Sequence, residues 1–169
     1  MFRVQSSKFK VQSLLLAAVT FMFGACSCGS DDKDEPEVAV ATQVAGSYTG
    51  TEIFVVDGEE SSNETKTYVF SKATDTSVDL VVPEVGMGMM TIPSVTVKGI
   101  ALSKNGNTIK GSVASYEGTV KGADGSDKAY TITDLTALFV DNSLVVKYSM
   151  KYGRMPFPFE CTFTATKKN

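Results

Sequence analysis

The residues most able to support specific chemistry lie in the segment Pro83–Pro93, PEVGMGMMTIP, where Met87, Met89 and Met90 fall within four positions. Thioether sulfur is a soft ligand that suits Cu(I), and methionine side chains also fill irregular apolar gaps or adapt to varied ligands. Three interpretations are therefore open: packing over one end of the fold, an apolar rim around a ligand pocket, or a soft-metal site. Because the chain has no histidine to complete a copper site, we predict no metal and no other cofactor.

The chain also lacks the residues on which much hydrolytic chemistry depends. Without histidine, Ser-His-Asp and Cys-His catalysis and the usual zinc sites are excluded. Glycosidase chemistry needs two carboxylates facing across a cleft, but Glu84, Glu117, Asp134 and Glu160 are scattered along the sequence. Cys161 shares its strand parity with phenylalanines and is interpreted as a buried, inert thiol. We therefore predict that the protein is not an enzyme.

Residues 1–25 have the features of a secretory signal peptide. A positively charged start precedes the apolar run Leu14–Ala25, whose length of about a dozen residues is typical of such signals. The run is too short to span a bilayer, which takes ~20 apolar residues. It ends in FGAC, which resembles a bacterial lipobox, where the cysteine is acylated and the peptide is cut just before it. We predict lipid attachment at Cys26, with Cys28 as the alternative site.

The residues that follow predict a tether. Between Asp31 and Glu37 there are five acidic residues and one lysine without an apolar period, so we assign 26–43 to a lipidated, disordered acidic linker. Acidic residues behind a lipidated cysteine are similar to the surface-export signal of Bacteroidetes lipoproteins, and a plain solvated spacer fits equally well. We therefore expect an outer-membrane lipoprotein held to the membrane by its lipid, with surface or periplasmic orientation left open.

Residues 44–169 are predicted to form one all-β domain. From Val38 onward the chain carries 12 basic and 14 acidic residues without a basic run, which excludes a nucleic-acid binder. Short segments rich in threonine, valine, tyrosine and phenylalanine are separated by turn signals such as Asp57-Gly58 and Asn105-Gly106. The predicted strands are 47–56, 65–72, 77–82, 95–102, 108–117, 128–140, 143–152 and 157–166.

Eight successive antiparallel strands joined by short turns favour an up-and-down barrel, because closure removes exposed edges; a two-sheet sandwich is the alternative. Gly50 and Glu52 interrupt the alternation of the first strand, which suggests a bend or bulge there. Glycines and flanking prolines predict that Pro83–Pro93 is irregular and partly covers one end of the barrel, with Met155 nearby if both loops share that end. No long helix is expected in the mature chain.

Three stretches together resemble the calycin-like β-barrel lipoproteins of Bacteroidetes: VAGSYTGT at 44–51, VTVKGIAL at 95–102 and RMPFPFECTFT at 154–164. Gly46-Ser47-Tyr48 is also similar to the glycine-x-tryptophan opening of lipocalins, with tyrosine in place of tryptophan. The resemblance covers nearly all of the chain after the tether. It implies an eight-stranded antiparallel calycin-like barrel located in the cell envelope, and it implies no catalytic residue.

The first functional hypothesis is the binding of a small apolar or amphipathic molecule. The residues expected to bind it are methionines and aromatic residues of Pro83–Pro93 and the last two strands: Met87, Met89, Met90, Tyr148, Met150, Met155, Phe157 and Phe159. The alternative is a non-catalytic interaction module that docks a protein or glycan through its loops. An apolar internal cavity would favour ligand binding, whereas a filled barrel with an exposed apolar patch would favour docking. The sequence sets no oligomeric state.

Overall fold

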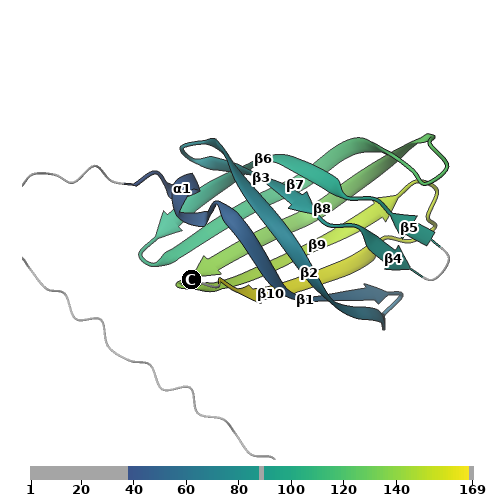
Figure 1. Cartoon of the computed structure of the whole chain (residues 1–169), viewed down its shortest axis with the longest axis horizontal. Helices are drawn as coiled ribbons and strands as arrows, with labels where there is room; N and C mark the ends of the chain where they lie inside the picture. The colour runs from purple at the N-terminus through teal and green to yellow at the C-terminus, as the bar shows by residue number, and fades with distance from the viewer. Residues whose placement is uncertain (1–37, 88–89, 168–169) are drawn as a thin grey trace, which may run out of the picture. The chain divides into compact units, whose positions relative to one another are not determined.

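The computed structural model describes residues 38–87 and 90–167, and these contain a closed antiparallel barrel (Figure 1). The order of strands around the barrel is β1-β10-β9-β8-β7-β6-β3-β2, and β1 closes the ring against β10. The barrel strands are β1 (Gly46–Val56), β2 (Glu59–Thr74), β3 (Ser77–Val82), β6 (Val95–Asn105), β7 (Thr108–Lys121), β8 (Asp127–Val140), β9 (Ser143–Tyr152) and β10 (Phe159–Thr166). The predicted eight-stranded barrel is therefore confirmed, and the two-sheet sandwich is excluded.

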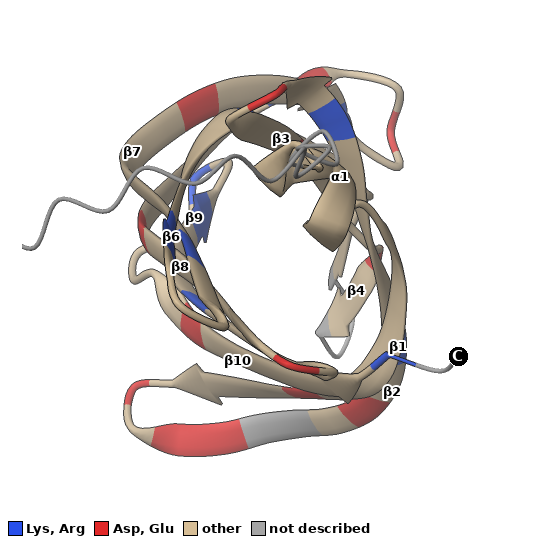
Figure 2. Cartoon of the chain, turned by 90° about the vertical axis from the view of Figure 1, so that its left-hand side faces the viewer, with Lys and Arg blue, Asp and Glu red and all other residues tan. Residues whose placement is uncertain are grey.

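The two ends of the barrel carry different elements (Figure 1). The α1 end has the short helix α1 (Val40–Val44), which packs on β2, β3 and β6, as Figure 2 shows from that side. This end also has the β2–β3, β6–β7 and β8–β9 turns. The opposite end, called the hairpin end, has the small hairpin of β4 (Val85–Met87) and β5 (Met90–Ile92), together with the β1–β2, β7–β8 and β9–β10 connections.

Two segments differ from the sequence prediction. The prediction that Pro83–Pro93 is irregular was wrong, because β4 and β5 pair in antiparallel register. Val85 and Ile92 face each other in that pair and are both buried, so burial of these two side chains outweighs the loosening effect of the glycines. Helix α1 lies partly within the stretch assigned to the tether, and its residues Ala41 and Val44 are buried against the barrel. The tether before residue 38 lies outside the described residues.

Alternating side chains fill the interior of the barrel. Every second residue of β9 from Leu144 to Tyr152 is buried, and the same holds for β10 from Phe159 to Ala165. Successive side chains of a strand point to opposite faces, so this pattern directs one set inward and leaves the other in solvent. Aromatic rings meet at three levels along the barrel: Tyr48, Phe70 and Phe139 toward the α1 end, Tyr68 on Phe163 in the middle, and Phe54 on Phe159 toward the hairpin end.

β1 pairs regularly with β2 and β10 at Gly50 and Glu52, so the bulge predicted at these residues is not there. The irregularity in the pairing of β1 with β2 falls later, between Phe54 and Val55. Gly50 lies directly against β10: a Cβ atom there would overlap the carbonyl oxygen of Thr164. Glu52 interrupts the apolar pattern for a different reason, because it is a charged residue type that points into the core.

Two strands extend beyond their neighbours. β2 pairs with β1 from Glu59 to Phe70, but its pairing with β3 begins only at Val69. β7 pairs with β8 as far as Lys121, whereas its pairing with β6 ends at Ser112. Within the part of the chain that the structure describes, 59–68 and 113–121 therefore each have one edge without a strand partner. Acidic residues follow one another along the first of these edges (Figure 2).

The close approach at Gly50 leads to a testable prediction. Gly50→Ala should destabilise the barrel by about 2–3 kcal/mol, because the added methyl group would overlap the backbone of β10 and force the closing strands apart. Gly86→Ala is the matched control, since a Cβ atom at that position meets nothing within 4 Å. Urea unfolding of both variants, in a form that begins at Ser27, measures the difference. Equal stability of the Gly50→Ala variant and the wild type would contradict this account of barrel closure.

Candidate functional site

A carboxyl group is buried in the middle of the barrel. Glu52 has no solvent-exposed surface and is the charged residue that is buried among those the structure describes. It points inward because it has the same strand parity as Tyr48 and Phe54, both of which lie in the core. The alternation of inward and outward side chains along β1 is sufficient to predict that Glu52 points inward. Tyr68 of β2 and Tyr148 of β9 reach toward Glu52 across the interior.

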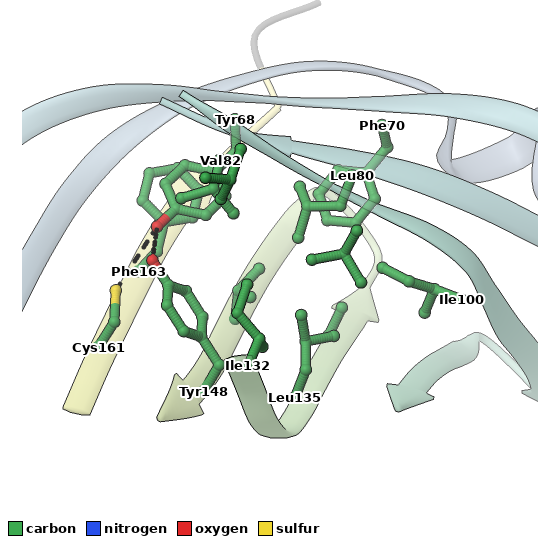
Figure 3. Packing of buried hydrophobic residues seen from close by; sticks show 14 of the residues in the cluster. Tyr68, Phe70, Leu80, Val82, Ile100, Ile132, Leu135, Tyr148, Cys161 and Phe163 are labelled. Atoms are coloured by element: carbon green, nitrogen blue, oxygen red, sulfur yellow. Dashed lines mark hydrogen bonds between the residues drawn. The ribbon is translucent and has the colours of Figure 1, made fainter. Parts of the chain in front are cut away.

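The hydroxyl of Tyr68 is the centre of this buried cluster. It donates a hydrogen bond to Oε2 of Glu52 at 2.5 Å. It also lies 3.1 Å from the Tyr148 hydroxyl and 3.5 Å from Sγ of Cys161 (Figure 3). Sγ of Cys161 is 4.0 Å from the same carboxyl oxygen of Glu52. Oε1 of Glu52 is also buried, and it has no hydrogen-bond partner among the described residues. The carboxyl group is therefore satisfied at one oxygen and unsatisfied at the other.

Burial dominates the electrostatics of the cluster. Removal from water raises the pKa of the Glu52 carboxyl from 4.5 to about 7, although the hydrogen bond from Tyr68 and the charge of Lys66 act in the opposite direction. Burial also raises the pKa of the Cys161 thiol to about 12 and pushes the pKa of Tyr148 well above its ordinary value. The thiol stays protonated at neutral pH and is 2% exposed, which confirms the predicted burial of Cys161.

An open pocket of about 330 Å³ lies at the α1 end of the barrel. Its floor consists of buried apolar or aromatic side chains: Val44, Tyr48, Ile109 and Phe139. Its rim consists of polar and charged residues, which come from α1, the β6–β7 turn, the β8–β9 turn and the end of β10: Gln43, Lys104, Asn107, Asp141, Asn142 and Lys167. Four segments that are distant in sequence therefore build one apolar depression with a hydrophilic border.

Contacts around Tyr48 fix the shape of this pocket. The Tyr48 hydroxyl donates to the carbonyl oxygen of Val44 at 2.8 Å, which ties the end of α1 to the first strand. The ring of Tyr48 also contacts Phe139 with ring centroids 5.7 Å apart. Nζ of Lys167 lies 5.8 Å from the centre of the Tyr48 ring, within the range of a cation–π interaction. The backbone N–H of Lys167 donates to the carbonyl oxygen of Asn142 at 2.6 Å.

The rim of the pocket carries an excess of positive charge. Lys104 and Lys167 contribute two positive charges, and Asp141 contributes one negative charge. Among residues 38–87 and 90–167, neither lysine has a carboxylate oxygen within 4.0 Å. The pocket can therefore offer cationic groups to an anionic ligand without first breaking an ion pair within this part of the chain.

A second, more open groove follows the outer wall across β1, β10 and β9. Its volume is about 700 Å³, and it is lined mainly by threonine and small residues, with no charged or aromatic side chain. Gly50 is one of its lining residues. The groove offers hydroxyl groups but few features that would hold and orient a particular ligand.

The residues that the sequence predicts for ligand binding do not come together around either pocket. Tyr148, Met150 and Phe159 are buried in the core. Met155 is partly buried against the core at the hairpin end, as expected, whereas Phe157, predicted to begin the last strand, is 62% exposed in the β9–β10 loop. Met87 is the last residue of β4 and Met90 the first of β5, whereas Met89 lies outside the described residues. Cys26 and Cys28 also lie outside them.

The pocket residues were missed because they come from separate elements. Lys104 and Asn107 belong to the β6–β7 hairpin and Asn142 to the β8–β9 hairpin, and strand register across the barrel decides that they meet. Within the described part of the chain, no three side chains of cysteine, aspartate or glutamate are grouped as metal ligands would be. A search of the same residues for a helix of sufficient length and apolarity to cross a membrane finds none.

Comparisons with known proteins agree with this architecture. Residues 44–166 match the family described as "Calycin-like beta-barrel domain". A comparison with curated proteins finds no match. Among solved structures, the chain is similar to a "putative outer membrane protein" from Bacteroides fragilis, with a TM-score of 0.58 and 17% sequence identity over 77% of this chain. The match spans 53% of that protein, about half of its length, so the likeness concerns the fold.

The family match begins at Val44, the last residue of α1, and finishes at Thr166, the last residue of β10. It therefore includes every strand of the barrel, the Glu52 cluster and the floor of the pocket at the α1 end. The resemblance seen in the sequence is confirmed, and the chain belongs to the calycin-like beta-barrel domain family.

Proposed function

We propose that this protein is a non-catalytic, lipid-anchored protein of the outer membrane whose barrel binds a small amphipathic molecule in the pocket at the α1 end. The observation that carries the proposal is the composition of that pocket, an aromatic and aliphatic floor inside a polar, cationic rim. Ligand sites commonly combine apolar walls with a few polar groups in a volume of about 300–1,000 Å³. At about 330 Å³ the pocket suits a molecule of one or two rings or a short chain.

The barrel interior is a poorer binding site than the pocket. Tyr148, Met150 and Phe159, which the sequence predicts as ligand contacts, belong to the packed core. A ligand in the interior would have to displace such side chains, and protein interiors have few voids larger than a water molecule. The pocket at the α1 end is already open and requires no displacement of the core.

The pocket also favours a particular kind of ligand. An apolar or aromatic body can lie on Tyr48 and Phe139, where ring contacts add to simple burial. An anionic group at the other end of the ligand can approach Lys104 and Lys167, since these cations outnumber the single carboxylate of Asp141. An amphipathic anion satisfies both parts of the pocket.

Location in the outer membrane is supported by two observations. The apolar run ends in FGAC at Cys26, which resembles a lipoprotein processing site, and an acidic tether follows it. The structurally similar protein from Bacteroides fragilis is described as an outer membrane protein, although only as a putative one. Because a single acyl chain binds membranes reversibly, stable anchoring of this kind relies on two or more chains.

A second candidate function is docking of a protein or glycan through the loops of the hairpin end. The observation that favours it is Phe157, which is 62% exposed in the β9–β10 loop beside Arg154 and the partly buried Met155. The filled interior is consistent with such a role. A single exposed aromatic side chain is nevertheless common on protein surfaces, so this observation is weaker than the composition of the pocket.

The pocket proposal is tested by titration with the anionic fluorescent probe 1-anilinonaphthalene-8-sulfonate. Asn107→Trp places a bulky ring on the rim and should weaken probe binding at least tenfold, about 1.4 kcal/mol. Lys104→Glu should also weaken binding, and raised salt should reduce the difference from wild type. Phe157→Ser is the matched control at the opposite end and should bind the probe normally. Loss of binding in the Phe157→Ser variant alone would favour the hairpin end instead.

Anchoring is tested by membrane fractionation and by mass spectrometry of the mature N-terminus. Cys26→Ala should abolish acylation and leave the protein unprocessed or released from the membrane, because the thiol is the acceptor of the lipid. Cys28→Ala should remain acylated and membrane-bound. The reverse result would move the attachment site to Cys28, and membrane binding of both single variants and the double variant would refute lipid anchoring.

A further inference from the structure

The Glu52 cluster is not needed for the pocket at the α1 end, yet it carries a cost. A buried carboxyl group is expensive even when it is hydrogen-bonded, and here one of its two oxygens has no partner among the described residues. An isosteric apolar or amide side chain would avoid this cost. A buried ionisable group held in such an environment is a candidate for a functional role.

We propose that Glu52 and Tyr68 form a proton-operated latch that holds the β1–β2 hairpin to β9 and β10, closed when the Glu52 carboxyl is protonated and loosened when it is ionised. The latch consists of the side chains of Glu52, Tyr68, Tyr148 and Cys161. The inference concerns the barrel wall and is independent of the proposed pocket function.

When the Glu52 carboxyl is protonated, the hydrogen bonds of the cluster form a continuous series. A proton on Oε2 of Glu52 can be donated to the Tyr68 oxygen at 2.5 Å, and the Tyr68 hydroxyl can then donate to Tyr148 at 3.1 Å or to Cys161 at 3.5 Å. The hydrogen bonds thus run in one direction from β1 to β2 and on to β9 or β10. The remaining oxygen, Oε1, is then part of a neutral carboxyl group, for which burial costs much less than for an anion.

The ionised state lacks compensation. Tyr68 then donates to Oε2, while Oε1 shares the negative charge without a hydrogen-bond donor among the described residues. The cation whose charge acts on Glu52 is Lys66, but Nζ of Lys66 lies 2.8 Å from Oε2 of Glu64 and donates to the Glu84 carbonyl oxygen at 3.0 Å. An unpaired buried anion is strongly destabilising, so an opening of the barrel that lets water reach the ionised Glu52 carboxylate is favoured.

The titratable groups that act on Glu52 come from β2, β9 and β10. From β2 they are Tyr68, Lys66 and Glu64, and from β9 and β10 they are Tyr148 and Cys161. The buried residues of β3 and β6 are aliphatic: Val78, Leu80, Val82, Val95, Val97 and Ile100. No second cation is therefore contributed by the buried residues of these strands.

The pairing of β2 indicates which part of the barrel would open. Residues 59–68 pair with β1 but have no partner on the β3 side within the described chain, so they are attached to the barrel through β1, which pairs with β10, and through side-chain contacts in the interior. Those contacts include the hydrogen bonds of Tyr68 with Tyr148 and Cys161 and the stacking of Tyr68 on Phe163 with ring centroids 4.0 Å apart. Ionisation of Glu52 weakens attachment at that point.

The direction of the pH dependence follows from linkage. The pKa of Glu52 is about 7 in the folded protein and 4.5 when the chain is unfolded, so between these values the folded state binds more protons. Stability is therefore greatest below pH 4.5 as far as this group is concerned, falls as pH rises toward 7 and is lowest above 7. The difference corresponds to a loss of about 300-fold in the folding equilibrium constant.

The chain offers an unusually clean background for this measurement. It contains no histidine, which is the side chain that normally titrates between pH 5 and 8. The pKa of Asp124 is lowered by its hydrogen bonds with Lys128 and Ser126, so its linked effect lies below pH 4. The pKa of Cys161 is raised to about 12, so its linked effect lies above pH 8.

The experiment compares wild type with Glu52→Gln, which mimics the protonated carboxyl, between pH 5 and 8. Wild type should lose about 70-fold in folding equilibrium constant over this range, which is the part of the total loss that falls between pH 5 and 8, and Glu52→Gln should change less than 5-fold. Glu60→Gln, an exposed carboxyl on β2 outside the group of residues that act on Glu52, is the matched control and should follow wild type. Tyr68→Phe removes the donor to the anion and should steepen the loss at pH 8. Urea unfolding of the form that begins at Ser27 provides these values.

Two further readouts distinguish a latch from a general effect on stability. Amide hydrogen exchange, with wild type and Glu52→Gln compared at the same pH, should show faster opening of residues 50–55 and 62–68 in wild type at pH 8. Uniform acceleration across all strands would overturn the latch. Carbon-13 NMR of the Glu52 carboxyl in wild type should titrate near neutral pH; titration below pH 5 would overturn the proposal even if the Glu52→Gln variant failed to fold.

Discussion

The structure depends on the contact that closes the barrel, where β1 lies against β10 at Gly50. The backbone of β10 occupies the space that a side chain at residue 50 would need, so the two strands meet only because that residue is glycine. The inward-facing positions on either side of Gly50 are Tyr48 and Glu52. Tyr48 forms part of the pocket floor, and Glu52 forms the buried cluster. One strand thus supplies closure, the pocket and the cluster at alternate residues.

The pocket and the cluster belong to two different environments within one barrel. Tyr48, Phe70 and Phe139 contact one another through their rings and form the layer beneath the pocket. Below this layer, the stacked pair of Tyr68 and Phe163 encloses the carboxyl group of Glu52 in an apolar surrounding. Lysine side chains at the rim remain hydrated, whereas the charge of Glu52 has been removed from water. The same barrel therefore presents cations to solvent and holds a carboxyl group whose ionisation is unfavourable.

The sequence is sufficient to predict the barrel because its strands follow local rules. The predicted strands 77–82 and 143–152 coincide with β3 and β9, the predicted strand 157–166 contains all of β10, and the turn residues at Asp57-Gly58 and Asn105-Gly106 marked two hairpins. The hairpin of β4 and β5 was missed, since the burial of Val85 and Ile92 depends on contacts with the rest of the barrel. Local rules cannot anticipate such contacts.

The candidate sites were predicted less well than the fold, and for the same reason. Lys104, Asn142 and Lys167 become neighbours only through the register of three separate strand pairs. The sequence prediction treats Glu52 as an interruption of the alternation in the first strand, because charged residues are rarely buried in a core. Its inward direction was available from alternation, but its partner Tyr68 was not, since the tilt of the strands brings the two side chains together.

The edge of β2 without a strand partner, residues 59–68, affects how two copies of the protein can associate. An unpaired strand edge is a template onto which another chain can add by backbone hydrogen bonding. Glu59, Glu60 and Glu64 lie on this stretch with a single lysine, Lys66, so the edge is negatively charged. Two copies brought together edge to edge would place like charges in close proximity, which disfavours pairing. Repulsion between these charges therefore disfavours edge-to-edge strand pairing between copies of the protein, even where many copies lie close together.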